Sequence, residues 1–283
     1  MTYDLNIPWS PTITPLSLER TITFLSDLGY QTLALTYTQP DHSLNSKHSN
    51  LIPINFSFDI PPKVTLLRRC TIVYSDPAHN YRLQSISQQF DILAIRPTNE
   101  KAFLASCVTI TEHSIISLDL TIRYPFHFKP KPLMTAIKRG IKIEISYGQC
   151  IGADAVGRRN FISNTMSIFR CTSGRGLIIS SEAVNAVSCR GMHDLVNLFG
   201  VWGLSKEKAI EGLGKNPREV VVNEGMKRTG FRGVIDVIDG GAEPSLVQAD
   251  HENKFKEKRP VDDKNIESDA SAKCNITKKC RVK

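Results

Sequence analysis

The sequence predicts an α/β protein folded as a (β/α) TIM-type barrel, followed by a disordered polar C-terminal tail. Two observations lead to the barrel. Strand-like runs recur at intervals of about 25–35 residues with helix-length segments between them, which is typical of βαβ units and a parallel sheet. Roughly seven or eight such units precede residue 240, which suits a barrel better than a doubly wound sheet. No Gly-x-Gly-x-x-Gly motif follows the first strand, so a dinucleotide-binding sheet is the weaker alternative.

Seven segments have the length and composition of strands. Most are rich in Ile, Leu, Val and Thr, and the sixth alternates with a period of two. In chain order, the predicted strands cover residues 3–6, 32–37, 64–74, 91–97, 115–120, 142–146 and 177–181. Residues 231–239 are predicted to be either strand-like or simply docked chain.

Helix signals lie between these strands. Pro15 suits a first helical turn, and Leu18 and Ile22 follow it at helical spacing. Asn99 is placed to cap a helix. In chain order, we expect helices over residues 15–28, 79–90, 100–108, 132–139, 155–172, 193–199, 205–213 and 217–228. Residues 38–62 are polar, contain four prolines and are expected to form a long loop.

The last part of the chain has a different composition. Residues 240–283 are rich in Lys, Asp, Glu, Asn and Ser, and they cannot bury enough apolar surface to offset the entropy of ordering. We therefore expect a barrel domain over residues 1–239 and a disordered charged tail over residues 240–283. Basic clusters at residues 254–259 and 278–283 are candidates for nuclear import or RNA contact, with a merely solvated tail as the alternative.

Composition limits the class of partner and the compartment. The formal net charge of +8 favours an acidic partner, most commonly nucleic acid, but it is equally compatible with a basic enzyme. The seven cysteines are scattered without a Cys-x-x-Cys pair, as expected of a reduced intracellular protein. Neither a signal peptide nor a membrane span is expected, because no run approaches about 18 apolar residues.

Candidate catalytic residues do not form a recognisable motif. Barrel enzymes carry their chemistry at the C-terminal ends of the strands. The polar residues expected there are Asp4, Asn6, Asp76, Arg96, Asp119, Glu144, Asp154, Ser180 and Ser181. No histidine belongs to a His-x-His or His-Glu-x-x-His motif, and Gly-x-Ser-x-Gly is missing. We expect Asp4 and Asp119 to act as caps or ion-pair partners, Ser180 and Ser181 to cap the next helix, and the cysteines to be structural.

The most informative segment for function is residues 147–181. It places Arg158 and Arg159 in the first turns of a helix whose apolar face includes Phe161. Arg175 lies between two glycines in the turn before the next strand. Arginine binds phosphate through paired hydrogen bonds, and glycine lets a backbone approach closely. The segment is therefore a candidate for RNA contact, and a helix with a solvated basic face and a glycine cap is the alternative that the residues alone leave open.

An ordered set of motifs then resembles a known family, the thirty-kilodalton protein subunit of ribonuclease P and ribonuclease MRP in archaea and eukaryotes. The matching motifs are YDLNIP (residues 3–8), DILAIRP (91–97), SLDL (117–120), KIEISY (142–147), the Arg158-Arg159 helix, GRGLIISS (174–181), RGMHDLVNL (190–198), GLS (203–205) and NPREVVVNE (216–224). Together they span about residues 1–238 in the expected order.

The resemblance implies a distorted (β/α) TIM-type barrel similar to that of metal-dependent PHP phosphoesterases. Those enzymes open with a His-x-His metal motif on the first strand, where this chain has Asp4-Leu5-Asn6. The resemblance therefore implies no catalytic residue, no metal site and no cofactor in the protein, with Mg²⁺ on the RNA component instead.

The resemblance also implies a function, partners and a location. The chain would be a non-catalytic RNA-binding subunit of ribonuclease P, and of ribonuclease MRP, supporting 5′-leader removal from precursor tRNA and pre-rRNA processing. Its partners would be the ribonuclease P/MRP RNA, precursor tRNA, a small protein subunit that forms a heterodimer with it, and other subunits, in the nucleus and nucleolus. Residues implied to contact RNA or a partner are Arg158, Arg159 and Arg175, and more weakly Arg190, Lys215, Arg218 and Arg228. Two alternatives stay open: a PHP-like metal-dependent phosphoesterase or nuclease acting by itself, and a scaffold without an RNA role.

Overall fold

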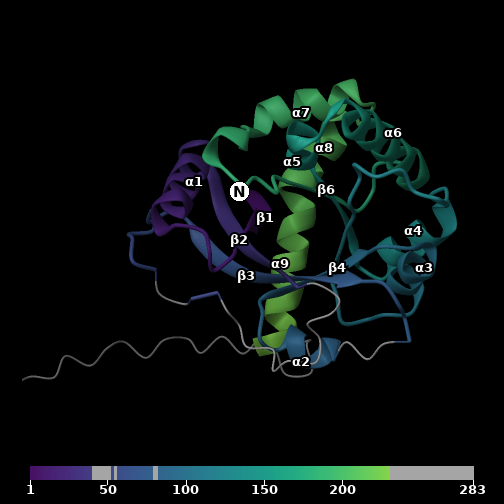
Figure 1. Cartoon of the computed structure of the whole chain (residues 1–283), viewed down its shortest axis with the longest axis horizontal. Helices are drawn as coiled ribbons and strands as arrows, with labels where there is room; N and C mark the ends of the chain where they lie inside the picture. Colours follow the sequence, from purple (N-terminus) through teal and green to yellow (C-terminus); the bar gives the residue numbers. More distant parts are fainter. Residues whose placement is uncertain (40–51, 54–55, 79–81, 230–283) are drawn as a thin grey trace, which may run out of the picture. The chain divides into compact units, whose positions relative to one another are not determined.

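Seven parallel strands curve into a nearly closed barrel with the helices outside it (Figure 1). In the computed structural model, the described residues are 1–39, 52–53, 56–78 and 82–229. The strands are β1 (Thr2–Pro8), β2 (Tyr30–Gln39), β3 (Thr65–Tyr74), β4 (Ile92–Pro97), β5 (Ile115–Ser117), β6 (Lys142–Ser146) and β7 (Leu177–Ser180). Each pairs in parallel with the next along the chain, from β1 to β7. The predicted barrel class is confirmed.

The helices lie close to their predicted positions, with three exceptions, one of which is an unpredicted 3₁₀ helix of three residues. They are α1 (Pro15–Asp27), α2 (Leu83–Ser87), α3 (Glu100–Val108), α4 (Pro130–Lys138), α5 (Tyr147–Gly152), α6 (Ala155–Thr172), the 3₁₀ helix η2 (Ala186–Ser188), α7 (Met192–Val201), α8 (Lys206–Leu213) and α9 (Lys215–Thr229). The prediction of a helix over residues 79–90 was too long at its C-terminal end, since α2 has a single turn that stops at Ser87, and residues 79–81 lie outside the described residues. Helix α5 was not predicted, because its residues follow the strand directly and contain two glycines. The predictions for residues 40–51, 231–239 and the tail lie outside the described residues.

Side-chain caps fix the start of two helices, and the first of these caps was predicted. The Asn99 side chain accepts a hydrogen bond from the N–H of Ala102 at 2.8 Å, as expected for the cap of α3. Asp154 accepts from the N–H of Gly157 at 2.7 Å and so begins α6. At its other end, α6 stops at a left-handed residue, Ser173.

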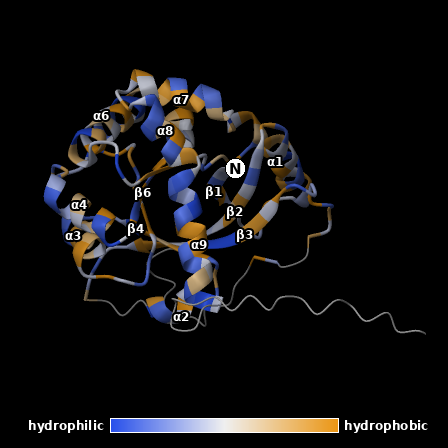
Figure 2. Ribbon diagram, turned by 180° about the vertical axis from the view of Figure 1, so that it is seen from behind, coloured by the Kyte–Doolittle hydropathy of each residue, from blue (hydrophilic) through white to orange (hydrophobic). Residues whose placement is uncertain are grey.

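The apolar core has separate parts outside and inside the barrel. The outward side chains of the strands pack against the surrounding helices. A smaller cluster fills one end of the barrel interior, and it includes Leu5, Ala34 and Ile178. Val220 of α9 completes this inner cluster, so α9 covers that end of the barrel. Figure 2 shows α9 crossing the strands, with hydrophilic and hydrophobic residues along its length.

Polar contacts attach α9 to the N-terminal ends of the strands. The Asn216 side chain donates to the carbonyl of Leu177, the first residue of β7, at 2.7 Å. The Lys142 ammonium at the start of β6 lies 2.6 Å from a carboxylate oxygen of Glu219. Since parallel strands begin at the same end, these contacts place α9 across the N-terminal end and leave the C-terminal end as the open mouth.

The barrel closes at a seam between β1 and the end of β7. The carboxylate of Asp4 accepts a hydrogen bond from the N–H of Ser181 at 3.0 Å, and the carbonyl of Asn6 accepts from the N–H of Glu182 at 2.8 Å. A register irregularity between Asp4 and Ile7 accompanies these bonds. The expectation that Asp4 caps a helix or forms an ion pair was therefore wrong: this carboxylate bonds strand backbone across the seam.

Candidate functional site

A fully buried ion pair crosses the barrel interior. Arg69 of β3 and Glu144 of β6 are both 0% exposed, and three steps in the strand order separate their strands. The guanidinium donates from Nη1 to Oε1 at 2.5 Å and from Nη2 to Oε2 at 2.6 Å. This two-bond geometry is the strongest form of an Arg–carboxylate contact. The pair therefore fixes opposite sides of the barrel relative to each other.

Surrounding polar groups satisfy the remaining bonding capacity of the pair. Arg69 also donates to the carbonyl of Leu5 at 2.6 Å and to the hydroxyl of Thr71 at 3.1 Å. Ser180 donates to Glu144 at 2.7 Å, so the prediction that Ser180 caps a helix was wrong. Burial alone would raise the pKa of Glu144, but the guanidinium and the hydrogen bonds to the carboxylate outweigh it and hold the pKa below its usual value. Glu144 is therefore ionised at neutral pH.

The amide of Asn6 joins the same interior network. It donates to Ser146 at 3.2 Å and, at 3.4 Å, to the second oxygen of Glu144. Neighbouring Ser181 does not cap a helix as predicted: its N–H bonds Asp4, and its hydroxyl accepts from the N–H of Ala183 at 3.2 Å. The Asp4-Leu5-Asn6 segment thus uses its polar side chains to close and brace the barrel.

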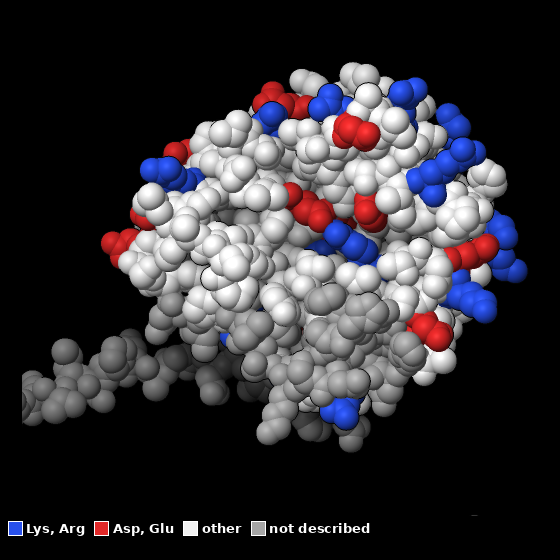
Figure 3. Space-filling model, in the orientation of Figure 1, with Lys and Arg blue, Asp and Glu red and all other residues white. Residues whose placement is uncertain are grey.

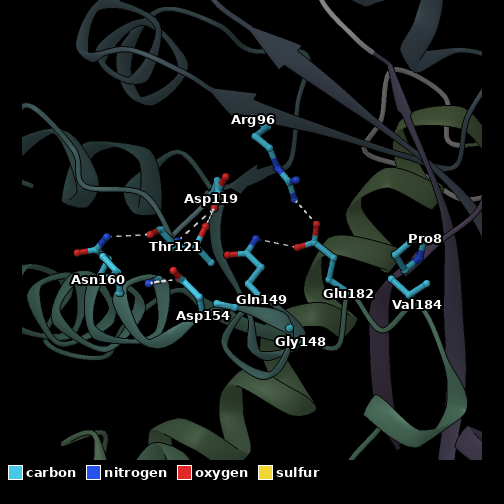
Figure 4. A pocket seen from close by; sticks show the side chains of 14 residues that line it. Pro8, Arg96, Asp119, Thr121, Gly148, Gln149, Asp154, Asn160, Glu182 and Val184 are labelled. Atoms are coloured by element: carbon cyan, nitrogen blue, oxygen red, sulfur yellow. Dashed lines mark hydrogen bonds and ion pairs between the residues drawn. The ribbon is translucent and has the colours of Figure 1, made fainter.

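A cavity of about 680 Å³ lies at the C-terminal mouth of the barrel (Figure 4). The residues that line it come from the ends of β1, β4 and β7 and from the segments after β5 and β6. They are Pro8, Arg96, Asp119, Thr121, Gly148, Gln149, Gly152, Ala153, Asp154, Val156, Gly157, Asn160, Glu182 and Val184. This is the position at which barrel enzymes place their chemistry.

Three side chains bond one another across the mouth. Glu182 accepts from Arg96 at 2.9 Å through one oxygen and from Gln149 at 2.8 Å through the other. The Gln149 amide also bridges the backbone of Leu118 and Leu120. Burial alone would lower the pKa of Arg96, but the Glu182 carboxylate raises it above its usual value. Figure 4 shows these side chains pointing toward one another.

The acidic residues of the mouth mostly hold local backbone. Asp119 accepts from the N–H and the hydroxyl of Thr121, at 3.1 and 2.6 Å, and so holds a local turn that begins no helix. Asp154 caps α6.

Among the described residues, no three His, Cys, Asp or Glu side chains come together as ligands for one metal ion. Also among them, no helix has the length and apolar character needed to span a membrane.

The described cysteines are free thiols. Burial raises the pKa of Cys70, Cys107 and Cys189 to about 12, so these thiols stay protonated at neutral pH. They behave as small apolar side chains within the core.

Asp4 is the buried carboxylate whose protonation changes near neutral pH. Burial raises its pKa from 3.8 to about 6, although hydrogen bonds from Ser181 and Asn6 oppose the shift. One carboxylate oxygen, Oδ2, has no hydrogen-bond partner among the described residues. Because the folded pKa exceeds the unfolded value, the stability contributed by protonated Asp4 is complete below pH 3.8 and is lost as pH rises through about 6.

We therefore expect Asp4→Asn to stabilise the fold at pH 7.5 by about 1–2 kcal/mol. The amide oxygen keeps the two backbone bonds, and the variant carries no buried charge. Urea unfolding at pH 7.5 and 4.5 measures the effect, and the gain over the natural protein should shrink at the lower pH. A gain of the same size at both pH values would contradict the assigned titration.

The structure distributes the seven predicted contact residues over several surfaces. Arg158 and Arg159 are exposed near the start of α6, beside the mouth. Arg175, Lys215 and Arg218 are exposed at the opposite, N-terminal end, close to the starts of β7 and α9. They therefore do not form one cluster with the α6 arginines.

Arg190 and Arg228 contact the protein itself. The Arg190 side chain donates to the carbonyls of Val187 and Cys189 at 2.6 and 2.8 Å, and its N–H donates to the Tyr147 hydroxyl. Arg228 donates to the carbonyl of Asp91 and lies 3.6 Å from the carboxylate of that residue. Both arginines therefore hold backbone of the protein itself. Their contact with RNA or a partner stays a prediction.

Sequence reasoning missed the interior pair and the mouth network. A signal for the pair was present, because Arg69 falls within a run of apolar strand residues and Glu144 alternates with isoleucines in the sixth strand. Charged residues at interior positions of a barrel need partners of opposite charge. No comparable signal marks Gln149, whose position depends on the unpredicted helix α5.

Fold and site together define the class: a (β/α)-barrel protein whose interior and mouth are braced by ion pairs among its own side chains. The family model described as RNase P subunit p30 matches residues 1–229. The chain belongs to this family.

Named relatives agree with the family assignment, and one solved structure shares the fold. The chain is 34% identical over 238 residues to "Probable ribonuclease P protein subunit 3" of Schizosaccharomyces pombe, covering 83% of this chain and 99% of the relative. It is 30% identical to the mouse "Ribonuclease P protein subunit p30", covering 80% and 86%, and 28% identical to the Saccharomyces cerevisiae "Ribonuclease P/MRP protein subunit RPP1", covering 86% of each. A chain in a cryo-EM structure of archaeal ribonuclease P with mature tRNA has the same fold, with a TM-score of 0.59 at 12% identity, covering 85% of this chain and all of that one.

Proposed function

We propose that this chain is a non-catalytic, RNA-binding protein subunit of ribonuclease P that supports removal of 5′ leaders from precursor tRNA. The observation that carries the proposal is the family match over residues 1–229. Relatives named as subunits of ribonuclease P support it along most of their length. The mouth network is consistent with it, because Arg96, Gln149 and Glu182 bond one another at the position where barrel enzymes hold substrate.

The mechanism that we propose is electrostatic and structural. Exposed Arg and Lys side chains neutralise phosphates, release counterions and stabilise the folded RNA. Mg²⁺ held by the RNA then supplies the metal chemistry of phosphodiester hydrolysis. The protein itself contributes affinity and assembly, with Arg158, Arg159 and Arg175 as the first candidates for phosphate contact.

The partners and location belong to the same proposal. They are the RNA component, precursor tRNA, a small protein subunit that pairs with this chain, and further protein subunits, in the nucleus and nucleolus. Membership of ribonuclease MRP, with a role in pre-rRNA processing, is supported by the name of the Saccharomyces cerevisiae relative.

The proposal is tested by gentle purification of the tagged, full-length protein from its own cells. We expect a structured RNA to co-purify and the eluate to remove the 5′ leader from a precursor-tRNA transcript. Digestion of the co-purified RNA before the assay should abolish cleavage, and an untagged extract serves as the control. Recovery without RNA, together with phosphoesterase activity of the protein alone, would contradict the proposal and favour the enzyme alternative.

A further inference from the structure

The loop between β5 and α4 presents basic side chains in an alternating pattern. Within residues 121–129, Arg123, His127 and Lys129 are exposed, whereas Tyr124 and Phe126 are partly buried. Alternation of this kind is expected of an extended segment that has one face on the protein and one face in solvent. The sequence analysis assigned no function to this loop.

Aromatic packing anchors the inner face of the loop. The ring of Phe126 lies 5.5 Å from that of Phe103 on α3, and the ring of Phe128 lies 5.6 Å from it. Tyr124 contacts both loop phenylalanines at 5.2 Å. Contacts of this geometry stabilise beyond the apolar area that they bury. The basic side chains of the outer face therefore stand on an ordered support.

One stripe of α6 holds the backbone of the loop. The Asn160 side chain donates to the carbonyl of Thr121 at 3.0 Å, and Asn164 donates to the carbonyls of Leu120 and Ile122, both at 2.9 Å. Further along the helix, the Cys171 thiol lies 3.1 Å from the carbonyl oxygen of Phe128. The loop thus runs beside α6 for about three turns.

The neighbouring stripe of α6 is exposed and basic at both ends. Arg159, Ser163 and Arg170 recur at helical spacing next to the loop-holding stripe, and all three are exposed. Figure 3 shows Lys and Arg outnumbering Asp and Glu along the edge of the molecule where Figure 1 labels α6 and α4. Loop and helix stripe together define the loop–α6 surface: Arg123, Lys129, Arg159 and Arg170.

We propose that the loop–α6 surface binds the sugar–phosphate backbone of RNA, with Arg123, Lys129 and Arg170 as contacts additional to Arg159. This inference rests on the proposed RNA-binding function and specifies the surface that performs it. Exposed basic side chains on a well-packed backbone lose little conformational entropy when they bind phosphate, and this favours binding. Within the described residues, the carboxylate near this surface that contacts one of its cations is Glu100, 3.9 Å from Lys129 and itself exposed. Such a contact is weak, so it leaves Lys129 available to phosphate.

The test compares two charge-matched double variants of the full-length chain. Arg123→Gln with Lys129→Gln removes two charges from the surface. Arg20→Gln with Lys63→Gln removes two exposed charges from α1 and from the segment before β3. Each is titrated by filter binding against the RNA that co-purifies with the natural protein, from 50 to 300 mM KCl, after thermal melting has confirmed folding.

We expect the loop variant to bind about tenfold more weakly at 100 mM KCl, with the slope of log affinity against log salt reduced by about 2. The control variant should stay within about twofold of the natural protein. If both variants bind RNA with equal affinity and the natural protein binds tightly, the loop–α6 surface is not the RNA-binding surface. The proposed function would then remain intact. Absence of RNA binding by the natural protein would overturn both.

Discussion

Replacing Glu144 with Gln should destabilise the barrel by about 3–5 kcal/mol, the usual cost of leaving a buried charge without its partner. Arg69 would keep its hydrogen bonds to Leu5 and Thr71 but would lose the carboxylate that neutralises it. Urea unfolding at pH 7.5 measures the change. A loss below about 1 kcal/mol would show that water or another group compensates Arg69.

A double-mutant cycle separates the ion pair from the polar site around it. Arg69→Met alone should cost a comparable amount, because it leaves Glu144 buried and ionised. The double variant Arg69→Met, Glu144→Leu should be more stable than either single variant, since apolar residues of similar size carry no desolvation cost. Additive losses in the double variant would contradict a direct pair.

The same ion pair makes the folding stability of the natural protein depend on pH in the acid range. The pKa of Glu144 is lower in the folded protein than its usual value of 4.5. Its contribution to stability is therefore present above about pH 4.5 and is lost as pH falls through the folded pKa. Stability from Glu144 is lost at lower pH than the pH range in which Asp4 titrates. The two effects are opposite, because Glu144 favours folding at higher pH and Asp4 favours folding at lower pH.

The double change Arg158→Gln, Arg159→Gln should weaken RNA binding about 10–30-fold at 100 mM KCl, because two phosphate contacts are removed. Each guanidinium bonds only backbone near its own helix within the described structure, at 3.5 and 3.2 Å. The fold should therefore melt within about 1 °C of the natural protein. The affinity ratio should be largest at low salt and shrink as salt rises, since the variant releases fewer counterions.

This expectation is checked by filter binding with the co-purifying RNA, with the Arg20→Gln, Lys63→Gln variant as the control for lost charge. Equal weakening by both double variants would indicate a general effect of net charge. Melting of the α6 variant at a clearly lower temperature would instead give the two arginines a structural role.

The sequence predicted the barrel because the residue patterns of single strands and helices can be recognised without knowledge of tertiary contacts. Strands such as β4 and β6 and helices such as α3 and α6 carry their own composition, period and caps. Strand order followed from the βαβ spacing, since consecutive parallel strands lie next to each other.

Contacts between distant segments could not be predicted in the same way. The Asp4–Ser181 bond joins residues 177 positions apart, and the Arg96–Glu182 bond joins residues 86 apart. Both depend on where the barrel closes, and the strand at that seam, β1, has an irregular register that no local pattern in the sequence indicates. The basic loop before α4 was missed for a different reason. Its exposed and buried faces alternate in a segment that forms no strand, so its pattern resembles an ordinary polar connection.

The interior ion pair also constrains how this lineage changes over time. Substitution of Arg69 alone or of Glu144 alone leaves a buried charge without its partner. Substitution of both residues together does not. The two positions are therefore expected to be inherited, or replaced, as a unit. Reopening the barrel interior as a ligand-binding space would need several simultaneous substitutions, so the architectural role of this barrel is hard to reverse.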